Sequence, residues 1–257
     1  MKVYLFIKQK KRSVALYKAY FEAMCKHMSV SPTLEDADIV LLFGAWSAEG
    51  ARVARKAVKM GIPYVVCPLG DISPRNNANP YMKRHMQTAC FQKKMCWKAN
   101  LLVATTPMEY AWLQKLGWNK SLVLIRYFSY SKLTALETMV GEWKDVCSAV
   151  INAFEEHKTK MIAAKTKDAI VAQILQIQSR MPHKNIPQQY LDNLHTLLYA
   201  DNYDEDALCH ELARLKLTAY AASVFEVMSV KTGLTEGFMP LPAHEGRKSR
   251  EILDYVK

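Results

Sequence analysis

Residues 39–44, Ile-Val-Leu-Leu-Phe-Gly, decide the fold class, because five consecutive apolar residues run straight into a glycine. An unbroken apolar run of this length is typical of a parallel strand whose two faces are both covered by helices. The glycine that follows is typical of a turn. This stretch therefore predicts a buried central strand, and it requires helices in the sequence on both sides.

The flanking sequence meets this requirement. Short apolar runs predict further strands at 3–7, 63–67, 101–104 and 121–125, and helical periodicity lies between them at 13–28, 48–60 and 80–98. Gly61 and Gly117 are placed to cap the ends of two helices. Thr106, Pro107 and Glu109 form the pattern of a capping box at the start of another. This alternation predicts an α/β fold, a Rossmann-like and mainly parallel sheet of about five strands, over residues 1–132.

The pattern changes at residue 133, beyond which strand signals nearly vanish. Apolar residues recur there at spacings of three and four, first as Leu136, Val140, Trp143, Cys147, Val150 and Phe154 and then as Ile170, Ile174, Leu175 and Ile177. Pro182 and Pro187 interrupt the series, and further helices are expected at 188–200, 205–230 and 245–256, with Asp204 or Asp206 capping the second. The sequence therefore predicts a second domain, a mainly helical region, at 133–257.

Charge divides along nearly the same line. Residues 1–133 carry 21 Lys and Arg against 7 Asp and Glu, a balance of +14, whereas residues 134–257 carry 14 against 17, a balance of −3. A strongly basic unit favours anionic partners such as lipid headgroups, diphosphate-linked substrates or nucleic acid. We expect the contacts with an anionic surface at five basic residues of 75–98: Arg75, Lys83, Arg84, Lys93 and Lys94. A solvated lysine-rich face without a partner explains the same charges equally well.

Several classes of site have no signal in the sequence. The six cysteines show no CxxC pattern and no histidine at a ligand spacing, so reduced thiols are expected and no metal. The motifs of dinucleotide-binding folds, P-loops, zinc proteases and serine hydrolases do not occur, so no cofactor is expected. No apolar run reaches the length of a membrane span and no export signal is recognised, which predicts a cytoplasmic protein with peripheral contact to the inner face of the membrane.

The chemistry is expected at the carboxyl ends of the predicted strands, where open parallel sheets bind ligands. No catalytic residue is assigned. Glycines there let a ligand approach the backbone, and hydroxyl and carboxylate groups can bind sugar hydroxyls; the acceptor-side candidates are Gly44, Trp46, Ser47, Gly70, Asp71, Thr105, Thr106 and Glu109. Each also has a structural reading: the glycines can serve positive φ angles, Trp46 can cover the core, and Thr106 with Glu109 can simply cap a helix.

Three ordered segments over about 90 residues resemble family 4 glycosyltransferases. Residues 37–47 resemble the strand and Gly-x-Trp-Ser-like loop of that family, residues 57–70 are similar to its Gly-Ile-Pro-Tyr-Val-Val strand and loop, and residues 99–109 with Leu116-Gly117 are similar to its Ala-Thr-Thr segment. The resemblance implies two Rossmann-like lobes around a cleft. The N-terminal lobe would bind the acceptor, often a lipid-linked glycan or an oligosaccharide, and the C-terminal lobe would bind the nucleotide sugar.

The departures from the family decide the functional prediction. Leu69 stands where the family commonly has a histidine, residues 125–132 do not match the usual exit to the second lobe, and 134–257 show no strand–helix–strand unit. We therefore predict an acceptor-type lobe of glycan or surface polysaccharide synthesis, inactive alone or dependent on a donor-lobe partner. The alternatives are a regulatory or scaffolding protein whose helices bind a protein partner and, less favoured, nucleic-acid binding through residues 80–98.

Overall fold

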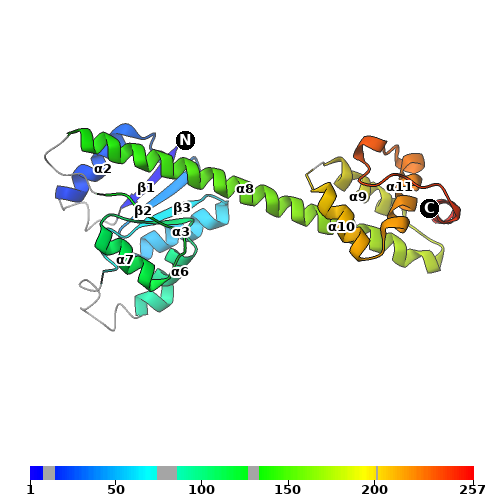
Figure 1. The fold of residues 1–257 in the computed structure, drawn as a ribbon, viewed down its shortest axis with the longest axis horizontal. Helices are drawn as coiled ribbons and strands as arrows, with labels where there is room; N and C mark the ends of the chain where they lie inside the picture. The colour runs from blue at the N-terminus through cyan, green and yellow to red at the C-terminus, as the bar shows by residue number, and fades with distance from the viewer. Residues whose placement is uncertain (8–14, 74–85, 127–132, 201) are drawn as a thin grey trace. The chain divides into compact units, whose positions relative to one another are not determined.

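A computed structural model describes residues 1–7, 15–73, 86–126, 133–200 and 202–257 (Figure 1). It divides into two compact units, Met1–Glu155 and Glu156–Lys257. The first is built on a parallel sheet and the second is helical, which confirms the predicted fold class. The division lies inside a long helix, α8 (Leu133–Arg180), whereas the sequence placed it at 132/133, where strands give way to helices.

The first unit holds a five-stranded sheet in the order β1-β2-β3-β4-β5, with every neighbouring pair parallel. The strands are β1 (Val3–Ile7), β2 (Ile39–Phe43), β3 (Tyr64–Cys67), β4 (Leu101–Ala104) and β5 (Leu122–Leu124). Every residue of β2 is buried, as its continuous apolar run predicts. Both faces of this strand therefore need cover.

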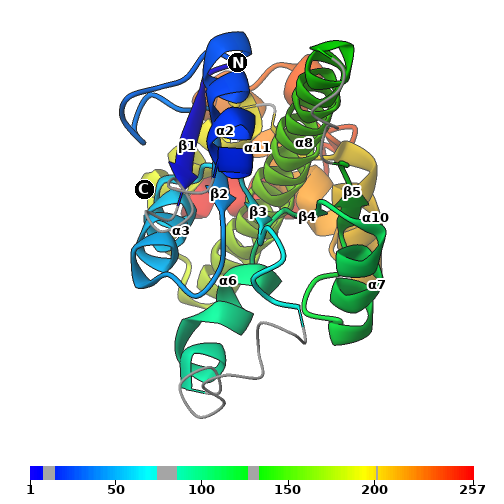
Figure 2. The ribbon, with the colours of Figure 1, turned by 90° about the vertical axis from the view of Figure 1, so that its left-hand side faces the viewer.

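The two faces of the sheet build two separate cores (Figure 2). On one face, β2 residues Ile39, Leu41 and Phe43 pack with α2 (Ala15–His27) and with the first part of α8. On the other face, Val40 and Leu42 pack with α3 (Ala48–Met60), α6 (Lys93–Trp97) and α7 (Pro107–Leu116). Alternate residues of one strand thus enter opposite cores, as the period of a strand dictates.

The five strands follow one another in sequence order, but the path of the chain changes direction once, as an isolated bridge beside β1 shows. Val30 pairs in parallel with Val3, and both backbone groups of Val3 are used there: its N–H donates to the carbonyl of Ser29 and its carbonyl accepts from Ser31, at 2.8 and 2.9 Å. Backbone groups of one strand residue point to one side, so this bridge lies on the edge of β1 away from β2. After α2 the chain therefore visits the outer edge of β1 and then returns to form β2 on the inner edge.

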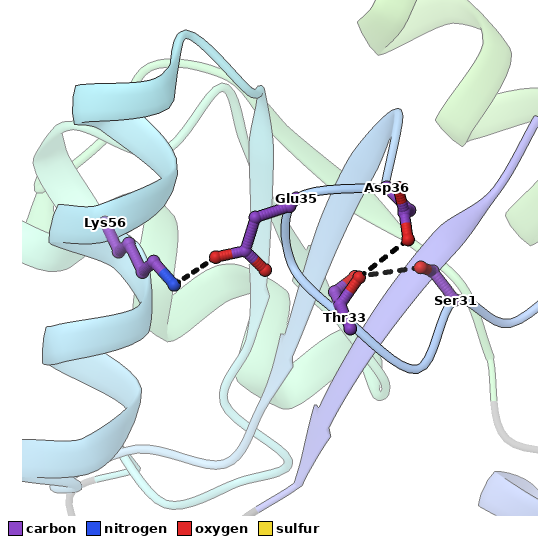
Figure 3. Close-up of polar contacts among 5 residues, drawn as sticks. All are labelled: Ser31, Thr33, Glu35, Asp36 and Lys56. Atoms are coloured by element: carbon purple, nitrogen blue, oxygen red, sulfur yellow. Dashed lines mark hydrogen bonds and ion pairs between the residues drawn. The ribbon is translucent and has the colours of Figure 1, made fainter.

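Short polar contacts fix the returning segment, residues 31–38 (Figure 3). The hydroxyl of Ser31 donates to the carbonyl of Thr33 at 2.8 Å, and the Thr33 hydroxyl donates to the Asp36 carboxylate at 2.9 Å. Glu35 forms an ion pair with Lys56 of α3. Ser31 is buried, but Thr33, Glu35, Asp36 and Lys56 are exposed. The contacts among these exposed side chains therefore define the path of the segment more than they stabilise the fold.

The ion pair makes a prediction for Glu35. The hydrogen bond and charge of Lys56 hold the pKa of the Glu35 carboxyl below its ordinary value of 4.5. Replacing Lys56 with methionine should raise that pKa back toward 4.5, because the folded chain no longer favours the ionised form. NMR titration of the carboxyl groups measures the pKa of Glu35, and Glu49, which is on the same helix as Lys56, serves as the control. An unchanged Glu35 pKa in Lys56→Met would show that the pair is not formed in solution.

The second unit consists of helices around one apolar core. They are the last part of α8, α9 (Gln188–Tyr199), α10 (Glu205–Arg214), α11 (Thr218–Thr232) and α12 (Arg247–Tyr255), with short 3-10 turns at Met181–His183 and Glu236–Phe238. Among residues 156–200 and 202–257 the β structure is limited to one bridge, Ile186 to Val256. No strand–helix–strand unit therefore occurs in the described part of this half.

The helical boundaries differ from the sequence prediction in two places. The two apolar series of 136–177 belong to one continuous helix, α8, in which Ile170, Ile174 and Ile177 are buried but Leu175 is 42% exposed. The helix expected at 205–230 divides into α10 and α11, because Lys216 between them has a positive φ of 58° that no α-helix accommodates. Asp204 caps α10 as expected, accepting from Ala207 N at 2.9 Å. Nowhere in the described chain is a helix both long and apolar enough to cross a bilayer.

Candidate functional site

The structure brings three of the predicted segments together at the carboxyl edge of the sheet. They are the loops that leave β2 (44–47), β3 (68–73) and β4 (105–106, with Glu109 on α7), which occupy neighbouring positions because their strands are neighbours. The chain changes direction across the sheet between β1 and β2, and the crevice expected at such a point adjoins the β2 loop.

Glu109 ties the β3 loop to the β4 loop. Its side chain is 4% exposed, and one carboxylate oxygen accepts from Gly70 N at 2.6 Å. The other accepts from the Thr105 N–H at 2.9 Å and from the Thr105 hydroxyl at 2.8 Å. The capping box is therefore only half formed: Thr106 accepts from Glu109 N at 3.1 Å, but the glutamate reaches Thr105 and Gly70 instead of the Thr106 backbone.

Asp71 and Gln92 hold the β2 loop in a similar way. The Asp71 carboxylate accepts from Ala45 N at 2.9 Å, and its carbonyl accepts from the indole N–H of Trp46 at 2.8 Å. The backbone N–H of Trp46 donates to the side-chain oxygen of Gln92 at 2.7 Å. Gln92 is fully buried and also donates to the Cys96 sulfur at 3.3 Å. The Trp46 side chain is 5% exposed, so it covers the core.

These contacts hold backbone conformations that L-residues rarely adopt. Trp46 has a φ of 58° and Leu69 a φ of 55°, two of the four non-glycine residues with positive φ in the described chain. Gly44 and Gly70, beside them, have φ angles of 89° and 76°. Left-handed backbone at non-glycine residues persists only where the surroundings impose it, and it gathers at ligand-binding sites. Two such loops on adjacent strands therefore mark this edge as the candidate site.

The candidate residues differ in how far they reach solvent. Thr106 is exposed and Ser47, Gly70 and Asp71 are half-buried, whereas Gly44, Trp46, Thr105 and Glu109 are buried. Ser47 also caps α3, its hydroxyl accepting from Gly50 N at 3.1 Å. The first group can contact a ligand directly and the second holds the loops in place. Whether any of them binds substrate stays a prediction.

The basic candidates lie only in part on the described chain. Lys93 and Lys94 are exposed on α6, whereas Arg75, Lys83 and Arg84 lie outside the described residues, as does the start of the helix expected at 80–98. The described remainder of that helix includes a π-helical turn, η1 (Thr88–Gln92). The sequence pattern gave no sign of this turn or of the buried role of Gln92, because a glutamine followed by two lysines is typical of a solvated position.

The groups at this edge that reach solvent can form hydrogen bonds with a ligand. Among the residues that the structure describes, no group of three or more His, Cys, Asp and Glu side chains could hold a metal ion. The buried Glu109 carboxylate is engaged by three donors, so its hydrogen-bonding capacity is directed at the protein. Leu69, at the position where the resembling family commonly has histidine, is 2% exposed and packs into the core that the sheet forms with α2 and α8.

Comparison with known proteins finds no matching family model, curated protein or solved structure.

Proposed function

We propose that the chain is the acceptor-side lobe of a glycosyltransferase-like protein of glycan synthesis, and that sugar transfer requires a nucleotide-sugar lobe on a second chain. The observation that carries the proposal is the left-handed backbone of Trp46 and Leu69, in the loops at the carboxyl edge of β2 and β3. These loops lie next to the point where the chain changes direction across the sheet. Backbone groups and the half-buried Ser47 and Gly70 suit hydroxyl-rich ligands, because a sugar offers many donors and acceptors.

The helical second unit supports the assignment of the donor lobe to another chain. A nucleotide sugar is held by phosphate-binding backbone at the ends of strands and the N-termini of helices in a Rossmann-like lobe. The described part of 156–257 is helical around a core of its own, and residues 156–257 carry 13 Lys and Arg against 13 Asp and Glu, a net charge of zero. A helical unit without an excess of positive charge does not favour a diphosphate, so we assign the donor to a partner chain.

Calorimetry with purified full-length protein tests both halves of the proposal. We expect no binding of UDP-glucose or GDP-mannose, and measurable binding of a water-soluble prenyl diphosphate-linked disaccharide. Ser47→Asn keeps a side chain that caps helices well but adds bulk at the half-buried edge, so it should weaken acceptor binding about tenfold, or ~1.4 kcal/mol. Asp204→Asn also places an asparagine at a helix N-cap, that of α10 in the helical unit, and should leave binding unchanged.

Two results would contradict the proposal in different ways. Binding and turnover of a nucleotide sugar by the chain alone would remove the need for a partner lobe. Absence of acceptor binding, or equal weakening by Ser47→Asn and Asp204→Asn, would remove the acceptor site from this edge of the sheet.

A specific observation favours the scaffolding alternative as a second candidate. In the helical unit the rings of His195, Tyr199 and Phe238 stack in series, with centroids 4.4 and 4.2 Å apart, and Tyr199 is 42% exposed. Exposed aromatic anchors are typical of protein interfaces. A photo-crosslinking residue at position 199 should then give one discrete adduct in cells, whereas the same residue at exposed position 231 should give none. Equal labelling at both positions would argue against an interface there.

A further inference from the structure

A cavity of about 300 Å³ opens between α3 and the segment formed by η1 and α6. Its floor is apolar and includes Ala54, Tyr64 and Met95, all buried. The cavity shares no residue with the loops at the carboxyl edge, and Tyr64 is the first residue of β3, so it lies toward the amino ends of the strands. It is therefore a place separate from the proposed acceptor site.

The rim of the cavity is cationic. Arg55 and Lys59 of α3 face it from one side, and Lys94 and Lys98 from the other, while none of the residues that line it is acidic. In the part of the chain that the structure describes, no ion pair involves any of these four side chains. Four unneutralised cations around one opening favour an anion with more than one negative charge.

The floor offers little that is polar to a ligand. The Tyr64 hydroxyl donates to the Met95 carbonyl at 2.7 Å. The π-helical turn contributes as well: Gln92 points into the core, where it binds Trp46, while its neighbours Cys90 and Phe91 line the cavity. π-helical turns are frequent at functional sites. The part of a ligand that reaches the floor must therefore be apolar.

We propose that this cavity binds an amphiphilic phosphate, a phosphate monoester or diphosphate that carries an apolar chain. The chain would fill the space above Ala54 and Met95, and the four cations would pair with the head. The size is at the lower end for small-molecule pockets, which suits a short segment of alkyl or prenyl chain. Two kinds of molecule carry a phosphate on an apolar chain: a free amphiphile in solution and a lipid in a bilayer.

Calorimetry with octyl phosphate, below the concentration at which it forms micelles, tests the proposal on the full chain. We expect octyl phosphate to bind at least about tenfold more tightly than inorganic phosphate or octanol, because only the whole molecule uses both rim and floor. Equal affinity for octyl phosphate and inorganic phosphate would overturn the proposal, since the cations would then act without the cavity.

A matched pair of double variants separates the cavity from general surface charge. Arg55→Ala with Lys94→Ala removes two rim cations and should weaken octyl phosphate binding about tenfold or more. Arg52→Ala with Lys93→Ala removes the same charge from the same two helices at exposed positions that do not line the cavity, and should change binding less than about twofold. Equal losses in the two variants would overturn the proposal.

Cysteine labelling gives a readout at the site itself. Cys90 is exposed and lines the cavity, and Cys25 is exposed elsewhere. Burial raises the pKa of the Cys96 thiol to about 12, so that thiol stays protonated and unreactive in the folded chain at mildly basic pH. Octyl phosphate should slow alkylation of Cys90 and leave Cys25 unchanged. Equal slowing of both, or of neither, would contradict occupancy of the cavity.

Vesicles distinguish the two sources. Val58 lines the cavity and is 47% exposed, so a larger side chain there does not enter the core. Val58→Trp should fill the opening and abolish octyl phosphate binding. If the natural head belongs to a lipid, retention on phosphatidic acid vesicles should fall in Val58→Trp; if the ligand is free, the protein should bind octyl phosphate without retention on vesicles. Retention that Val58→Trp leaves intact, together with no binding of octyl phosphate, would overturn the proposal.

Discussion

Replacing Glu109 with alanine is expected to lower the free energy of unfolding of the sheet unit by about 3 kcal/mol or more. The substitution removes a carboxylate that is 4% exposed and accepts from three donors: the N–H groups of Gly70 and Thr105 and the Thr105 hydroxyl. A buried donor without an acceptor loses its full hydration, and bonds to a charged acceptor are the stronger kind. The loss should therefore exceed that of a typical point substitution.

Glu109→Ala should lower the stability of the β3 loop by more than it lowers the stability of the whole unit. With the carboxylate gone, the β3 loop loses its tie to the β4 loop, so hydrogen exchange at the Gly70 amide should speed up by more than the change in global stability explains. Glu109→Gln keeps the shape and one acceptor oxygen of the side chain, so its free energy of unfolding should lie between that of the wild type and that of Glu109→Ala. Glu142→Ala, at an exposed position of α8, should shift stability by less than about 0.5 kcal/mol.

Chemical denaturation and amide exchange by NMR measure these effects. A Gly70 amide that stays protected in Glu109→Ala would mean that the β3 loop is held by other groups, and the candidate site would not depend on this carboxylate. If Glu109→Gln proved as damaging as Glu109→Ala, the negative charge itself, and not the number of acceptors, would be what the loops require.

The sequence predicted the strands well because their signal is local. An apolar run such as 39–43 and a glycine such as Gly61 or Gly117 reveal burial and a left-handed cap without knowledge of any distant residue. Residues of the capping box around Thr106 were also identified by local spacing. The destination of the Glu109 side chain was not, because Gly70 is 39 residues away and nothing in the spacing points to it.

The candidate site was predictable in position and not in detail. Parallel strands place their carboxyl ends along one edge, so the loops after β2, β3 and β4 had to be neighbours once the strands were recognised. The roles within the loops depend on long-range contacts, such as that between Trp46 and Gln92, 46 residues apart. The cavity between α3 and α6 was invisible for the same reason: its cations are scattered in sequence and meet only in the fold.

Distant packing also explains why the boundary of the first unit lies at 155 and not at 132. The first part of α8 looks like the start of a helical domain, since it follows the last strand and has helical periodicity. Its apolar face, however, is buried against the sheet: Trp143 and Cys147 are fully buried in the core that contains Ile39, Leu41 and Phe43. A sheet face with so many apolar residues needs this cover, so the helix belongs to the sheet unit up to residue 155.

Trp143→Ala should accordingly be the most destabilising substitution on α8. The side chain is 0% exposed, and its ring lies 5.4 Å from that of Phe43, centroid to centroid. Truncating a buried tryptophan removes its transfer free energy and leaves a cavity, which together amount to about 3–5 kcal/mol. Trp143→Phe retains most of the contact and should lose less. Trp97→Ala, at a residue that is 66% exposed, should change stability by less than about 0.5 kcal/mol.

Because the two units have separate cores, Trp143→Ala should destabilise the sheet unit and leave the helical unit unchanged. Trp143 packs in the core of Met1–Glu155, whereas the helical unit has a separate core built from residues such as Leu194, Leu212 and Phe225. Hydrogen exchange followed by mass spectrometry should therefore show lost protection in β1, β2 and α2 and unchanged protection in α9 and α11. Equal loss in both units would mean that they unfold as one, because α8, continuous from Leu133 to Arg180, would then transmit the defect from one core to the other.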